Sequence, residues 1–82
     1  MVISWAPFGG AGVKRYEVIR VRSWNGSTVP RGKKIASVNR TRATTATDAR
    51  PQQGTFYVVV ALGAKGKVLA IGSVRAPDAV TP

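Results

Sequence analysis

The residues that usually carry catalysis or bind metal ions are nearly absent from this chain. Its 82 residues include no histidine, no cysteine and only three acidic residues. The three carboxylates, Glu17, Asp48 and Asp78, stand far apart, which argues against a paired-carboxylate hydrolase or a calcium cage. Zinc sites need cysteine or histidine ligands. We therefore expect no metal site, no cofactor and no catalytic residue, although a serine activated by a lysine base stays open as an alternative.

Positive charge is the chemical feature that the chain does carry. Thirteen lysines and arginines against three acids give a net charge of +10, which favours anionic partners. Basic residues gather in the middle of the chain, together with a tryptophan that is available for stacking or cation–π contact. The alternative is a charged sheet edge that prevents aggregation. The predicted binding strip consists of Arg20, Arg22, Trp24, Arg31, Lys33, Lys34, Arg40 and Arg42.

The composition also ranks the possible partners. Nucleic acid is less favoured, because modules that bind it interleave aromatic with basic residues and aromatics make up only 7% of this chain. A protein partner, like subunits or an acidic polymer remain. The longest apolar run, 56–62, is too short to span a bilayer, so we expect no membrane insertion. The glycines of 9–12 lack the Gly-Lys-Ser/Thr of a phosphate loop and indicate a flexible loop.

The elements that must position these residues are predicted to be strands. Turn residues recur at short intervals between segments rich in β-branched and aromatic residues, which is typical of an all-β sandwich or barrel. In segment 14–22, alternation places Tyr16 and Val18 on one face and leaves apolar residues on the other. Segment 55–62 is apolar on both faces, which predicts a strand buried on both sides. The six predicted strands are Val2–Trp5, Lys14–Arg22, Lys33–Val38, Ala43–Asp48, Thr55–Leu62 and Lys67–Val74.

One ordered set of residues runs through these predicted strands. The set comprises Trp5, Tyr16 and Val18, Ile35–Val38, Thr47 and Asp48, Pro51 and Gly54, Tyr57, Val59 and Ala61, and finally Gly66. This order resembles the fibronectin type III domain, especially its forms in bacterial extracellular proteins. The resemblance covers about residues 2–75 and implies an immunoglobulin-like β-sandwich for 1–75, with 76–82 as an extended tail or linker. The expected core residues are Trp5, Tyr16, Val18, Ile35, Tyr57, Val59 and Ala61.

Two features depart from the family pattern. The family places a corner tyrosine at the start of strand F, and that position falls here on Thr55 or Phe56, depending on the register. The family's strand A would precede Val2, so the first strand is left as an open edge. The chain is then a fragment, or its own tail fills the gap, or a neighbour's strand fills it in trans. The residues expected at this contact are Val2, Ile3, Arg75, Ala76 and Val80.

The resemblance implies a function as well as a fold. It implies a non-catalytic interaction or structural module in an extracellular, cell-surface or virion setting. The open edge and the high charge favour a subunit of an assembly that packs through this edge against an acidic neighbour or polymer. The alternative is a basic protein that binds nucleic acid or another polyanion, for which affinity would fall steeply with salt.

Overall fold

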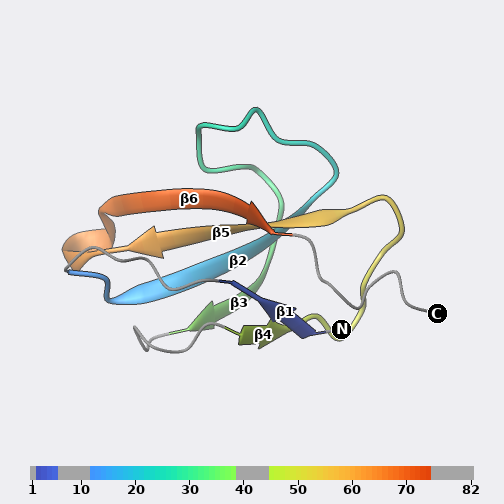
Figure 1. Cartoon of the computed structure of the whole chain (residues 1–82), viewed down its shortest axis with the longest axis horizontal. Coiled ribbons are helices and arrows are strands. Elements are labelled where there is room, and N and C mark those ends of the chain that lie inside the picture. Colours follow the sequence, from blue (N-terminus) through green and yellow to red (C-terminus); the bar gives the residue numbers. More distant parts are fainter. Residues whose placement is uncertain (1, 6–11, 39–44, 75–82) are drawn as a thin grey trace.

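The chain folds as two antiparallel β-sheets packed face to face, shown by a computed structural model that describes residues 2–5, 12–38 and 45–74 (Figure 1). The described residues form six strands: β1 (Val2–Ser4), β2 (Arg15–Val21), β3 (Lys33–Val38), β4 (Thr45–Thr47), β5 (Phe56–Leu62) and β6 (Val68–Val74). The larger sheet has the order β3-β2-β5-β6, and the smaller one pairs β1 with β4. The predicted all-β sandwich is therefore confirmed.

The strand bounds follow the sequence patterns closely. The bounds predicted for β3 are those observed, and β1, β2, β5 and β6 are each shorter than predicted by one residue at one or both ends. The hairpin before β6 contains a short 3₁₀ turn, Ala64–Gly66, in which Lys65 takes a φ of 59°. Residues 43–44 and the predicted tail, 76–82, lie outside the described residues. Within the described ranges, no helix is long and apolar enough to cross a membrane.

The two faces of the large sheet carry two separate apolar clusters. Because β2 and β5 pair with Tyr16 opposite Ala61 and Val18 opposite Val59, these residues share the face that meets the smaller sheet. Trp5 packs edge-on against Tyr16, with 5.5 Å between ring centroids. All seven residues predicted for the core lie in this inner cluster, five of them buried and Trp5 and Ile35 partly buried.

The opposite face of the large sheet carries the outer cluster. Its buried members are Ile19, Val21, Val58, Val60 and Leu62. Trp24, from the 22–32 loop between β2 and β3, packs against this cluster. The loop lies on the other side of the large sheet from β1 and β4 (Figure 1). The central strands are therefore apolar on both faces because both faces are covered, as the sequence of 55–62 predicts.

The sandwich is closed along one side and open along the other. The short strand β4 lies beside β3, so the two sheets meet there. Among the described strands, β1 pairs only with β4. On this side β1 does not approach β6 as closely as β4 approaches β3. The edge of β1 that no described strand pairs with and β6, the outermost strand of the large sheet, therefore border the same opening.

Candidate functional site

A buried ion pair links the two sheets near one end of the sandwich. Arg20 Nη1 lies 2.9 Å from Asp48 Oδ2 and 3.1 Å from Oδ1, and it also donates to the carbonyl of Arg50 at 2.6 Å. The Tyr57 hydroxyl donates to Asp48 Oδ2 at 2.8 Å, and the backbone N–H of Arg50 donates to Oδ1 at 2.9 Å. The side chains of Arg20 and Asp48 are only 9% and 3% exposed. Each of these polar groups therefore has a partner within the protein, which indicates that this ion-pair cluster has a structural role.

The pKa values of the cluster reflect this environment. Burial by itself raises the pKa of Asp48, but the hydrogen bonds from Arg50, Arg20 and Tyr57 outweigh burial and bring it below the ordinary 3.8. Burial, reinforced by the hydrogen bond to Asp48, raises the pKa of Tyr57 to about 12. At neutral pH the carboxylate is therefore charged and the phenol is protonated, which is the combination that the observed hydrogen bonds require.

Sequence reasoning missed this cluster, although it named Arg20, Asp48 and Tyr57 separately. Arg20 was expected in the binding strip, but its guanidinium is directed to Asp48 and is nearly enclosed. Tyr57 was expected only as a core residue, and its hydroxyl was given no partner. Its position in β5 is one or two residues beyond those considered for a corner tyrosine, Thr55 and Phe56. The signal that could have found the cluster is Asp48 itself, one of only three acids in the chain. A carboxylate at the end of a strand that faces the core needs a buried cation nearby.

Three other basic residues of the predicted strip surround a groove at the same end of the molecule. Arg22 directly follows β2, Arg31 lies in the loop two residues before β3, and Lys33 begins β3. All three are exposed. The groove has a volume of about 370 Å³, and we call it the basic groove. Its lining includes Arg22, Ser23, Arg31, Lys33, Gln52 and Thr55.

The remaining residues of the predicted strip lie elsewhere. Lys34 Nζ is 3.4 Å from Glu17 Oε2, an exposed contact that Arg15 shares at 3.5 Å. Trp24 packs on the outer cluster, and its indole N–H donates to the carbonyl of Thr28 at 2.6 Å. Arg40 and Arg42 lie outside the described residues. The structure therefore gathers Arg22, Arg31 and Lys33 around the basic groove, while Trp24 lines a neighbouring pocket of about 510 Å³ that Arg31 also borders.

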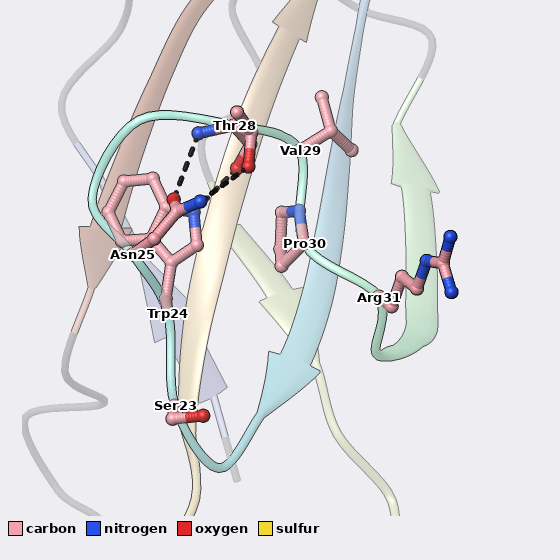
Figure 2. Close-up of a pocket in the computed structure, with 7 residues that line it drawn as sticks. All are labelled: Ser23, Trp24, Asn25, Thr28, Val29, Pro30 and Arg31. Atoms are coloured by element: carbon pink, nitrogen blue, oxygen red, sulfur yellow. Dashed lines mark hydrogen bonds between the residues drawn. The ribbon is translucent and has the colours of Figure 1, made fainter.

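The loop that carries Trp24 is organised by Asn25. Its side-chain oxygen accepts hydrogen bonds from the backbone N–H groups of Ser27 and Thr28, at 2.9 and 3.1 Å. Its amide also donates to the Thr28 hydroxyl at 2.8 Å. Figure 2 shows this loop in front of the strands, with Arg31 pointing away from Trp24 and Asn25. The turn at Asn25-Gly26, where Gly26 has a φ of 88°, therefore positions Trp24 over the outer face of the large sheet.

A second cavity, of about 260 Å³, lies at the open side of the sandwich, and we call it the edge cavity. Its lining includes Trp5, Tyr16, Val59, Ala61, Ala70 and Gly72. The cavity exists because β6 presents small residues here, with Ala70 opposite Ala61 and Gly72 opposite Val59 on the inward face. It exceeds the roughly 150 Å³ of an apolar cavity that accepts benzene.

The residues predicted for the edge contact are placed only in part. Ile3 is fully buried in the inner cluster and Val2 is 53% exposed, as their alternation along β1 requires. The other predicted contact residues, Arg75, Ala76 and Val80, lie outside the described residues. Trp5, which was expected only in the core, also lines the edge cavity. Its indole nitrogen is buried, and no described residue offers it a hydrogen-bond acceptor.

In comparisons with family models, with curated proteins and with solved structures, nothing matches this chain. The resemblance to the fibronectin type III domain therefore stays a prediction, and the geometry of the two cavities carries the functional argument.

Proposed function

We propose that this domain is a non-catalytic interaction module that receives an extended segment of a neighbouring protein chain at its open side. The segment would pair with the edge of β1 that no described strand occupies and send side chains into the edge cavity, in the manner of β-strand addition. In keeping with the fibronectin type III resemblance, the proposal includes an extracellular or virion-surface assembly as its setting.

The observation that carries the proposal is the buried indole N–H of Trp5. A buried donor without an acceptor costs about 1–3 kcal/mol, so native proteins rarely keep one unless something else satisfies it. No described residue accepts this hydrogen bond, and the same side chain lines the edge cavity. An added strand would bring backbone carbonyls to this side of the domain.

The edge of β1 supports the same proposal. A strand at the edge of a sheet presents unpaired backbone groups, and proteins usually blunt such edges with charge, proline or a cover. The sequence of β1, Val-Ile-Ser, contains no charged residue and no proline, and β4 is its only partner among the described strands. The small inward residues of β6, Ala70 and Gly72, leave room for the apolar side chains of an incoming strand.

Charge favours one kind of partner. The chain carries +10, so a second copy would be repelled at low ionic strength, whereas an acidic segment would be attracted. We therefore propose an extended segment that alternates apolar with acidic residues. Its apolar side chains would enter the cavity and its carboxylates would face solvent and the basic surface.

The alternative of a nucleic-acid-binding protein has less support. Stacking platforms for single strands present exposed aromatic rings beside basic residues. Here the Trp24 ring packs on the outer cluster and its N–H is bonded within its own loop. The Arg20 guanidinium is occupied by Asp48.

Calorimetric titration with blocked peptides tests the proposal. The probes alternate valine with glutamate over roughly eight residues, which is a common strand length. A matched control peptide has the same composition with two central residues replaced by proline, which cannot continue a ladder. We expect saturable binding of the alternating peptide with a Kd below about 1 mM and much weaker binding of the control.

A variant at Gly72 makes the test specific to the edge cavity. A Cβ at Gly72 would meet no atom within 4 Å, and its backbone does not require glycine. Gly72→Leu should therefore fill the cavity, raise the free energy of unfolding by about 1–2 kcal/mol and weaken peptide binding at least tenfold. Gly72→Ala, the matched control, should retain binding. Undiminished binding to Gly72→Leu, or no binding to the wild type, would contradict the proposal.

A further inference from the structure

We propose that the basic groove is a binding site for a phosphate monoester. This inference goes beyond the proposed function, because the groove and the edge cavity share no lining residue. It rests on three cations that no described residue neutralises and that converge from separate parts of the chain, and on the neutral donors beside them.

The positive charge in the groove is not compensated within the described part of the chain. Arg22, Arg31 and Lys33 make no ion pair with any described residue. The two described carboxylates face other cations, since Glu17 contacts Lys34 and Arg15 while Asp48 holds Arg20. Asp48 thus neutralises Arg20, the least exposed cation of the groove lining, and neither described carboxylate pairs with the three exposed cations.

The fold holds these cations at one place. Arg20 and Val21 pair with Tyr57 and Phe56 across β2 and β5, so Arg22 emerges beside the turn that precedes β5. A Cβ at Gly54 would lie 3.8 Å from Arg22 Nη1, which places the guanidinium against that turn. Lys33 lies opposite Arg20 at the start of β3. Strand register and this turn therefore place Arg22 and Lys33 at the groove, and Arg31, two positions before Lys33, lines it from the preceding loop.

The chemistry of the groove favours a doubly charged oxyanion. Guanidinium groups bind phosphate oxygens through two parallel hydrogen bonds, and lysine adds a point charge. Ser23 and Gln52 line the same groove and supply neutral donors. A phosphate monoester carries close to two negative charges at pH 7, whereas each diester of a nucleic acid backbone carries one. The volume of about 370 Å³ accommodates the phosphate and part of the group that it esterifies.

The test compares small ligands on the intact chain by calorimetry at about 150 mM salt, where long-range attraction is screened. The ligands are phenyl phosphate, inorganic phosphate and dimethyl phosphate, which represent a monoester, the free anion and a diester. We expect phenyl phosphate to bind at least as tightly as inorganic phosphate, and dimethyl phosphate to bind about tenfold or more weakly. Tighter binding of the free anion or equal binding of the diester would overturn the assignment to a monoester.

A pair of charge-matched variants locates the site. The double variant Arg22→Gln/Arg31→Gln should weaken phenyl phosphate binding by about tenfold or more. Lys65→Gln/Lys67→Gln removes the same charge near the 3₁₀ turn, at the opposite end of β5 from the groove, and should leave binding unchanged. All four side chains are exposed, so both variants should keep the wild-type unfolding midpoint. Equal loss in both variants, or no binding by the wild type, would overturn the proposal.

Discussion

The guanidinium of Arg20 and the carboxylate of Asp48 form a buried ion pair, with 2.9 Å between Nη1 and Oδ2, that joins the large sheet to the small one. Arg20 lies in β2, and Asp48 directly follows β4. The small sheet has only two three-residue strands, so its own hydrogen bonds fix its position weakly. We infer that this ion pair, together with the Tyr57 hydroxyl, sets how the small sheet sits on the large one.

Removal of Asp48 should therefore be among the most damaging single changes. Asp48→Ala leaves the buried Arg20 guanidinium without its partner and should lower the free energy of unfolding by about 3–5 kcal/mol in urea denaturation. Tyr57→Phe removes one hydrogen bond and should cost about 1 kcal/mol. Lys34→Gln breaks an exposed ion pair and should cost under about 1 kcal/mol. A cost for Asp48→Ala no larger than that of Lys34→Gln would refute the structural role of the pair.

The same cluster predicts how stability depends on pH. The pKa of Asp48 is lower in the folded chain than its ordinary 3.8, so its contribution is complete above pH 3.8 and is lost as the pH falls through the folded pKa. The pKa of Tyr57 is raised to about 12, so its contribution is complete below its ordinary value of 10.0 and is lost as the pH rises toward 12. Unfolding midpoints measured across pH should fall at both extremes. In Tyr57→Phe the alkaline loss should be smaller, and an identical alkaline profile would contradict this account.

Gly32 is predicted to be essential for a close approach rather than for an unusual backbone angle. A Cβ at Gly32 would overlap the carbonyl oxygen of Arg20 and lie 2.7 Å from Val21 Cγ1. Gly32→Ala should therefore push the start of β3 away from β2 and lower the free energy of unfolding by about 1–3 kcal/mol. Gly26→Ala is a useful comparison, since Gly26 has a φ of 88° but open space around it. If Gly32→Ala unfolds at the wild-type urea concentration, the close packing of this loop is refuted.

The sequence predicted the strands well because strand periodicity is a local property. The alternation in 14–22 and the two-sided apolar run in 55–62 anticipated β2 and β5 and their faces. Trp24 was expected beside the basic residues, available for stacking, whereas its ring packs on the outer cluster. That outcome depends on how the 22–32 loop folds back, which no local pattern determines.

The site was less predictable because it depends on pairing between distant residues. Arg20 and Asp48 are 28 positions apart, and the sequence does not indicate which basic residue forms an ion pair with the buried carboxylate of Asp48. The strip of basic residues was therefore expected to include Arg20, whereas the structure gathers Arg22, Arg31 and Lys33 and turns Arg20 inward. The edge cavity was foreseen as an open strand edge, but its volume depends on the small residues that β6 places opposite Val59 and Ala61.

The indole N–H resonance of Trp5 tests the central claim, that the open side of the sandwich accepts an added strand. The chain has two tryptophans, and the indole of Trp24 already donates to Thr28, so its resonance serves as an internal control. Trp24→Phe would assign the two signals in a proton–nitrogen correlation spectrum. On titration with the valine–glutamate peptide, the Trp5 signal should move downfield as its proton gains an acceptor, while the Trp24 signal stays in place. A Trp5 signal that does not move at peptide saturation, or a shift confined to Trp24, would contradict the account.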